Sequence, residues 1–125
     1  MVTILIIDDD EAVRQSTARI LTGANHRVIE AANGLIGMKL LHAERPSAVI
    51  CDLIMPVQEG IETIREIRRL APQTFIIAIS GSLGGKNADY LSAAKKLGAD
   101  AVLSKPFRPA ELLRILREGM RGSLA

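Results

Sequence analysis

Acidic side chains follow two apolar stretches of strand length in this chain. Asp8 and Asp9 come directly after the apolar residues 4–7, and Asp52 comes directly after the apolar residues 48–51. Carboxylates gathered in a partly desolvated site would repel one another, so a cation is needed to offset the repulsion. Magnesium takes one or two carboxylates, keeps several waters and leaves room for phosphate oxygens. The sequence therefore predicts a magnesium site where these two stretches end.

Two further apolar stretches end in groups suited to phosphoryl chemistry. Residues 75–79 precede Ser80, and residues 101–103 precede Ser104 and Lys105. An aspartate beside magnesium and facing a lysine is equipped to attack phosphorus and to form an acyl phosphate. The metal and the lysine would neutralise charge on the equatorial oxygens as the phosphoryl group passes in line. The Ser80 hydroxyl and the backbone amides after Asp52 would then bond the phosphoryl oxygens.

A simpler interpretation of the same acids requires no functional site. Asp8, Asp9 and Asp10 would cap a helix, and Asp52 would be an unrelated surface carboxylate. This interpretation leaves Asp52 and Lys105 unexplained, so we favour the phosphoryl-transfer site.

These groups would be positioned by strands that alternate with helices. The predicted strands span residues 2–7, 26–30, 48–51, 75–79 and 101–103, and a predicted helix follows each of them. Strict alternation implies a parallel sheet with helices on both faces and right-handed crossovers. Open sheets of this class place their sites at the carboxyl ends of the strands. The acids, the hydroxyl and the lysine are therefore expected to meet in one crevice.

Local signals place several helix ends. Asp10 and Glu11 suit the first turn of a helix, where carboxylates cap free amides and match the helix dipole. Residues 57–60 are interpreted as a polar loop before a helix that buries Ile61. Gly98 stands where a helix C-terminus favours glycine. The last helix is expected to begin at about Pro109.

Composition favours a single soluble domain. The 125 residues are 48% hydrophobic and 24% charged, and we expect one domain over residues 1–125 with a core at about 2–120. The three aromatic residues are too few for a base-stacking platform, so direct binding of nucleic acid is not expected. The arginines at 65–69 and 114–121 are interleaved with glutamates and are interpreted as solvated helix faces, with a surface for an acidic partner as the alternative.

Cysteine content and hydropathy indicate the cellular compartment that the protein is expected to occupy. The chain has one cysteine, Cys51, within a strand that we expect to be buried, so we interpret it as a structural residue. A single cysteine excludes an internal disulfide framework and suits a reducing cytoplasm. No apolar stretch approaches the length of a membrane span, and the first residues do not form a signal peptide. We therefore predict a cytoplasmic protein without membrane contact.

Taken together, the motifs resemble the receiver domain of bacterial two-component response regulators from Val2 to about Met120. The residues that carry the resemblance are Ile7-Asp8-Asp9-Asp10, Asp52-Leu53-Ile54-Met55-Pro56 with Gly60, Ser80-Gly81 and Lys105-Pro106-Phe107. In this order and at these strand ends they are highly specific. The resemblance implies an α/β, flavodoxin-like (βα)5 fold, a doubly wound parallel sheet with strand order 2-1-3-4-5. It also implies a cis peptide bond between Lys105 and Pro106.

The same resemblance implies a signalling switch. Asp52 would be the phosphoacceptor for a phosphoryl group from a sensor histidine kinase, with Lys105 and Ser80 taking the places of the family's lysine and its switch hydroxyl. Mg²⁺ would be bound directly by Asp9 and Asp52, through water by Asp8, and by the backbone carbonyl of Ile54. The protein would catalyse only its own phosphoryl transfer and dephosphorylation. It would relay the signal to a downstream protein or output domain, and a phosphorylation-dependent dimer stays open.

Two positions depart from the family pattern. Val102 stands three residues before the lysine, where the family often has an aromatic residue, so an aromatic swing cannot relay a movement of Ser80. Ile54 stands where many relatives have a polar side chain. With Ile54 and Ser82 flanking the route of the attacking water, no carboxylate or amide orients that water. We therefore expect slow hydrolysis of the phosphoryl group.

Two other functional classes were weighed against this one. A magnesium-dependent phosphatase with an aspartyl nucleophile usually needs a general acid near that nucleophile, and the position two residues after Asp52 is Ile54. Such enzymes also tend to need a substrate cap, for which this chain is short. A flavin-binding module of the same fold would surround the flavin phosphate with amides and hydroxyls, and the three carboxylates argue against it.

Overall fold

The structure is a computed structural model that describes residues 1–53, 57–81 and 87–121. Strands and helices alternate strictly along these ranges. The strands are β1 (Thr3–Ile7), β2 (Arg27–Ala31), β3 (Ala48–Asp52), β4 (Phe75–Ser80) and β5 (Ala101–Ser104). The helices are α1 (Glu11–Gly23), α2 (Gly34–Glu44), α3 (Val57–Leu70), α4 (Asn87–Leu97) and α5 (Pro109–Gly119). All neighbouring strands are parallel, in the order β2-β1-β3-β4-β5, which confirms the predicted fold.

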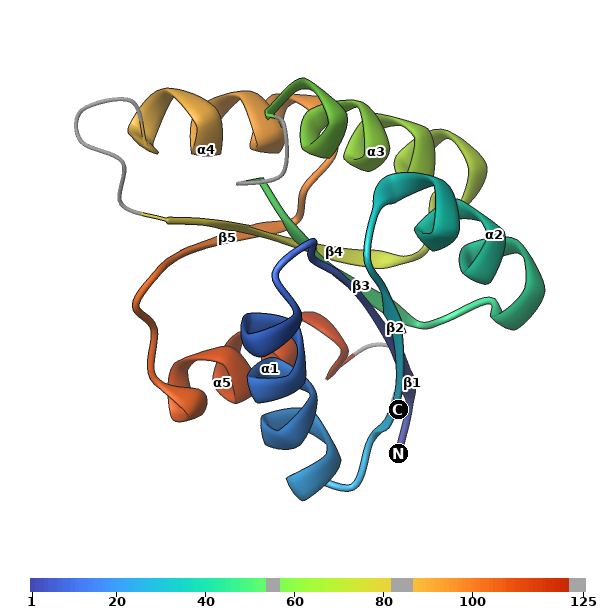
Figure 1. Ribbon diagram of the computed structural model, residues 1–125, viewed down its shortest axis with the longest axis vertical. Coiled ribbons are helices and arrows are strands. Elements are labelled where there is room, and N and C mark those ends of the chain that lie inside the picture. The colour runs from blue at the N-terminus through green and yellow to red at the C-terminus, as the bar shows by residue number, and fades with distance from the viewer. Residues whose placement is uncertain (54–56, 82–86, 122–125) are drawn as a thin grey trace.

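Helices cover both faces of the sheet. Helices α1 and α5 lie on one face, and α2, α3 and α4 lie on the other (Figure 1). Because both faces of the central strands are covered, their residues are apolar except at the strand ends, where Thr3, Asp52 and Ser80 stand. In β1, Ile4 and Ile6 pack toward one helical layer, whereas Leu5 and Ile7 pack toward the other. The two cores are almost entirely aliphatic.

Two of the predicted helix ends are confirmed. The carboxylate of Asp10 caps α1 by accepting a hydrogen bond from the backbone N–H of Val13 at 3.2 Å. Gly98 follows α4 with a φ of +133°, a conformation that L side chains rarely adopt. Asp10 therefore caps the start of α1, and Gly98 ends α4, each for the reason that the sequence suggested.

The predicted loop at residues 57–60 is wrong, because α3 already begins at Val57. The polar residues there form the first helical turn, where Glu59 suits the helix dipole and its Oε1 accepts a hydrogen bond from the Gly34 N–H at 3.0 Å. Gly60, which suggested a loop, is required by packing instead. A Cβ at this position would lie 3.1 Å from the carbonyl oxygen of Asp52. The glycine lets the helix pass close to the end of β3.

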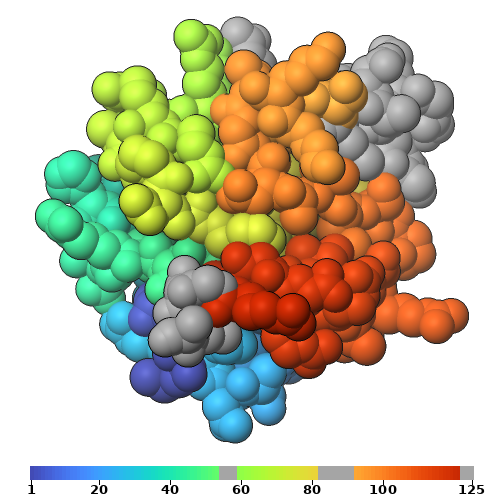
Figure 2. Space-filling view, turned by 180° about the vertical axis from the view of Figure 1, so that it is seen from behind, coloured from blue at the N-terminus to red at the C-terminus, as the bar shows by residue number. Residues whose placement is uncertain are grey.

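The interpretation of the arginine clusters as solvated faces is wrong for Arg68. This side chain is 25% exposed and donates hydrogen bonds to the carbonyl oxygens of Pro72, Thr74 and Gly98, while it also pairs with Asp100. It thereby connects the end of α3 to the turn after α4, and the two helices lie side by side (Figures 1 and 2). Arg68 is a structural crosslink between elements.

The packing of α2 on the sheet predicts the effect of one substitution. A Cβ at Gly37 would overlap the end of the Ile7 side chain, which is fully buried directly before Asp8. Overpacking costs about 1–3 kcal/mol, and alanine recovers about 1 kcal/mol of helix propensity. We therefore expect Gly37→Ala to lower the free energy of unfolding by up to about 2 kcal/mol in urea denaturation.

Gly23→Ala is the matched control, because no atom lies within 4 Å of a Cβ built at the end of α1. This variant should be as stable as the wild type or slightly more so. Equal losses in the two variants would contradict the close approach of α2 to Ile7.

Candidate functional site

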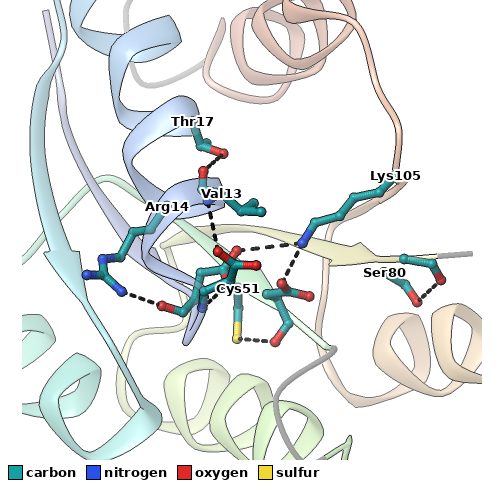
Figure 3. Close-up of polar contacts among 10 residues, drawn as sticks. Val13, Arg14, Thr17, Cys51, Ser80 and Lys105 are labelled. Atoms are coloured by element: carbon teal, nitrogen blue, oxygen red, sulfur yellow. Dashed lines mark hydrogen bonds and ion pairs between the residues drawn. The ribbon is translucent and has the colours of Figure 1, made fainter.

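Side chains from three strand ends meet at one edge of the sheet. Asp52 closes β3, Asp8 follows β1 and Lys105 follows β5. The Nζ of Lys105 lies 2.7 Å from Oδ2 of Asp52 and 3.7 Å from Oδ2 of Asp8 (Figure 3). Because β4 separates β3 from β5, the long lysine stem must reach across the end of β4. The structure therefore brings together residues that lie far apart in the sequence.

The two carboxylates of this cluster are buried. Asp8 is 4% exposed and Asp52 is 3% exposed. The pKa of Asp8 is raised to about 7, chiefly by burial and also by the neighbouring Asp52 carboxylate, whereas the Asp10 N–H bond and the Lys105 ammonium lower it. The Asp10 N–H donates to Oδ1 of Asp8 at 2.9 Å. Two acids in this position repel each other at neutral pH, and a bound cation would remove the repulsion.

The donor set suits Mg²⁺ in its chemistry. Asp9 follows Asp8 at the carboxyl end of β1 and is exposed to solvent, while Asp8 and Asp52 supply buried carboxylate oxygens. Mg²⁺ prefers oxygen ligands and retains several waters. Among the described residues, no three histidine, cysteine or acidic side chains are already grouped closely enough to hold a metal. Ile54, predicted to offer its backbone carbonyl, lies outside the described residues.

Ser80 ends β4 and is buried. Its hydroxyl donates a long hydrogen bond of 3.3 Å to the carbonyl oxygen of Gly81 (Figure 3). Its own carbonyl oxygen accepts from the backbone N–H of Lys105 at 2.8 Å, which ties the end of β4 to the lysine. The Lys105–Pro106 bond is cis, which confirms that prediction.

The first backbone amide after Asp52 is not available to a phosphoryl group. The N–H of Leu53 donates to the carbonyl oxygen of Ile79 at 2.7 Å and so extends the pairing of β3 with β4. The next two amides, of Ile54 and Met55, lie outside the described residues. The prediction that amides after Asp52 bond the phosphoryl oxygens therefore does not hold for Leu53.

Cys51 and Arg14 complete the surroundings of the acids. Cys51 is fully buried, and burial together with the carboxylates of Asp52 and Asp8 raises its pKa, so it stays a neutral thiol. Arg14, which the sequence analysis did not single out, donates to the carbonyl oxygen of Asp8 at 2.8 Å. One signal for this role of Arg14 is present in the sequence: a cationic residue stands six positions after Asp8, in the first turns of a predicted helix.

No helix in the described part of the chain is both long enough and apolar enough to cross a membrane.

Comparison with known proteins adds independent information. The profile of the response regulator receiver domain matches residues 4–117. The chain is 34% identical to the transcriptional regulatory protein AfsQ1 of Streptomyces coelicolor, over 98% of this chain and 55% of that protein. It is also 34% identical to the response regulator MprA of Mycolicibacterium vanbaalenii, over 96% of this chain and 51% of that protein. The chain thus spans about half the length of these curated relatives.

Solved structures agree with this match. A CheY-like response regulator receiver domain from Methanospirillum hungatei has a TM-score of 0.85 at 30% identity, over 96% of this chain and 94% of that one. A response regulator from Chloroflexus aurantiacus has a TM-score of 0.87 at 28% identity, over 96% and 98% of the two chains. Sequence and fold therefore point to the same set of relatives.

Proposed function

Because the chain belongs to the response regulator receiver family, we propose that it is a phosphoacceptor switch in a two-component system, with Asp52 as the acceptor. Response regulators are signalling proteins that receive their signal from sensor kinases and act through output domains. The observation that carries the proposal is the buried cluster in which Lys105 Nζ lies 2.7 Å from Asp52 and 3.7 Å from Asp8. The whole of residues 1–125 would then act as one receiver domain.

Mg²⁺ would be held by residues of this cluster. Asp9 and Asp52 would bind the ion directly, Asp8 would bind it through a water, and the backbone carbonyl of Ile54 would supply a further oxygen. The buried pair of carboxylates supports this assignment, because their repulsion is offset when a divalent cation is bound. When bound, the ion supplies positive charge that stabilises the oxygens of the transferring phosphoryl group.

Phosphoryl transfer would proceed at the Asp52 carboxylate. One of its oxygens attacks phosphorus on the kinase phosphohistidine, the O–P bond forms, and the P–N bond breaks with its electron pair leaving on the imidazole nitrogen. Lys105 would exchange its contact with Asp52 for one with a phosphoryl oxygen, since an ammonium on a flexible stem can follow the charge. The product is an aspartyl phosphate on this chain.

The signal would pass outward from the end of β4. The acyl phosphate adds negative charge and strong acceptors at Asp52, and the Ser80 hydroxyl, which donates a long bond of 3.3 Å to the Gly81 carbonyl oxygen, would turn toward it. Val102 on β5 is half-buried in the core, and its side chain has no aromatic ring that could swing inward when Ser80 moves. The change would therefore be a population shift that alters the surface near residues 90–116 and its partner preference.

The proposal is tested by intact-mass measurement after incubation with acetyl phosphate and Mg²⁺. We expect the mass of one phosphoryl group per chain, and no gain when the metal is chelated. Steady release of phosphate from an ester substrate, in place of labelling that stops at one group per chain, would favour the aspartyl phosphatase instead.

Hydrolysis of the aspartyl phosphate offers a separate prediction at Ile54. An aliphatic side chain cannot orient the attacking water, whereas an amide can. We expect Ile54→Asn to shorten the half-life of the phosphorylated protein by about 3- to 10-fold, followed by the decay of the intact mass after removal of acetyl phosphate. Ile54→Leu is the control and should decay at the wild-type rate. An unchanged half-life in Ile54→Asn would show that this position does not limit hydrolysis.

A further inference from the structure

Arg14 joins two elements behind the acidic cluster. Its Nη1 donates to the carbonyl oxygen of Asp8 at 2.8 Å, and its Nε lies 3.1 Å from Oε1 of Glu30 on β2 (Figure 3 shows Arg14 reaching toward the end of β1). The Arg14 side chain is 15% exposed and that of Glu30 is 38% exposed. Because the guanidinium is largely shielded from water, its bonds are stronger than those of an ordinary surface ion pair.

The group that Arg14 holds is the peptide unit between Asp8 and Asp9. The Asp8 carbonyl and the Asp9 N–H belong to one plane, so a bond to that carbonyl also fixes the direction in which Asp9 leaves the strand. On the other side, the Asp8 N–H is held by the carbonyl oxygen of Ala31 at 3.1 Å. Within the described ranges, no hydrogen bond or ion pair holds the Asp9 carboxylate itself. Its placement therefore depends on its backbone.

We propose that Arg14, oriented by Glu30, is a positioning residue that presents Asp9 for Mg²⁺ binding beside Asp52. This inference rests on the proposed function, because it takes Asp9 and Asp52 as the ligands. Arg14 does not touch the metal or the phosphoryl group. It acts through the Asp8–Asp9 peptide unit, which keeps Asp9 at the rim of the site before the ion arrives.

Charge and positioning predict opposite effects when Arg14 is replaced. If Arg14 acted only through its positive charge, its removal would strengthen the binding of a cation nearby. If it positions Asp9, its removal frees the peptide unit, and Mg²⁺ binding weakens because the ligand must be ordered on binding. The sign of the change therefore separates the two explanations.

The test is calorimetric titration of the full chain with MgCl₂, at fixed ionic strength and well below the unfolding temperature. We expect Arg14→Met to raise the dissociation constant by about 5- to 20-fold. Arg14→Lys keeps the charge and one donor and should recover part of the loss. Glu30→Gln keeps an acceptor for the guanidinium and should have a smaller effect. Arg19→Met removes the same charge from an exposed position of α1 and should bind Mg²⁺ like the wild type.

Amide hydrogen exchange in the metal-free protein gives a second readout that does not depend on Mg²⁺. The amides on either side of Asp9 are hydrogen-bonded, that of Asp8 to the carbonyl oxygen of Ala31 and that of Asp10 to Oδ1 of Asp8. Both should exchange faster in Arg14→Met than in the wild type, while amides in the middle of β3 stay equally protected. Arg14→Met that binds Mg²⁺ as tightly as the wild type, or more tightly, would overturn this inference alone. A wild-type protein that takes up no Mg²⁺ would overturn the proposed function and this inference together.

Discussion

Asp52→Asn is expected to abolish phosphorylation by acetyl phosphate. The amide cannot form the acyl phosphate, so labelling should fall by at least about 100-fold relative to the wild type. Intact mass after incubation with acetyl phosphate and Mg²⁺ measures the effect directly. Asp52 is the favoured acceptor because the Nζ of Lys105 lies 2.7 Å from its carboxylate and 3.7 Å from that of Asp8.

The matched control for this variant is Asp10→Asn. Asp10 is exposed and caps α1 through its side-chain oxygen, and asparagine caps a helix about as well as aspartate. This variant makes the same chemical change two residues from Asp8 and should still gain one phosphoryl group. Circular dichroism of both variants establishes that the fold is retained.

Labelling that persists in Asp52→Asn would contradict the assignment of the acceptor. Peptide mapping of the modified chain would then locate the phosphoryl group on another acid, with Asp8 and Asp9 as the nearest choices in the site. Loss of labelling in both variants would point to a damaged β1–α1 loop instead of a lost acceptor. The pair of variants therefore separates the chemistry of Asp52 from the integrity of the site.

Asp8→Asn is expected to stabilise the metal-free protein at and above neutral pH. The pKa of Asp8 rises from its usual 3.8 to about 7 in the folded protein, so the folded state holds a proton that the unfolded state has released. As pH rises from about 4 to about 7, the unfolding free energy of the wild type falls, by at most about 1.4 kcal/mol per pH unit from this group. Asparagine at position 8 stays neutral at every pH, so Asp8→Asn does not undergo this fall in unfolding free energy.

Urea denaturation across pH measures this difference. We expect Asp8→Asn to exceed the wild type by about 2–4 kcal/mol at pH 8, and the difference to level off below about pH 3, where Asp8 is protonated in both states. The comparison with the wild type cancels the titration of groups that the two proteins share. A difference that stays constant from pH 4 to pH 8 would show that the gain comes from packing and not from the charge of Asp8.

Magnesium should reverse the order of the two proteins. An ion that binds the folded state alone stabilises it in proportion to its affinity and concentration. The wild type has the full set of carboxylates and should gain stability with added MgCl₂ at pH 8, whereas Asp8→Asn should gain little. The Asp8 carboxylate, which destabilises the metal-free protein, would then stabilise the Mg²⁺-bound protein.

Much of the fold could be predicted from local signals in the chain. Apolar stretches of strand length, the carboxylate cap at Asp10 and the glycine at Gly98 depend on residues near one another in sequence. The alternation of strands and helices then implied a parallel sheet, and the position of Asp8, Asp52 and Lys105 directly after strands implied that they meet. The cis bond before Pro106 and the strand order came from the family resemblance.

Only the tertiary structure determined which distant residues contact one another. Arg68 contacts Gly98 across 30 residues and Arg14 contacts Glu30 across 16 residues, and no periodic pattern connects such positions. Gly60 belongs to the first turn of α3 and passes close to the end of β3, whereas its sequence neighbourhood had suggested a loop. The raised pKa of Asp8 is likewise a product of burial and of a neighbouring acid. Periodicity and capping are local properties of the chain, whereas burial and side-chain pairing exist only once distant segments have packed together.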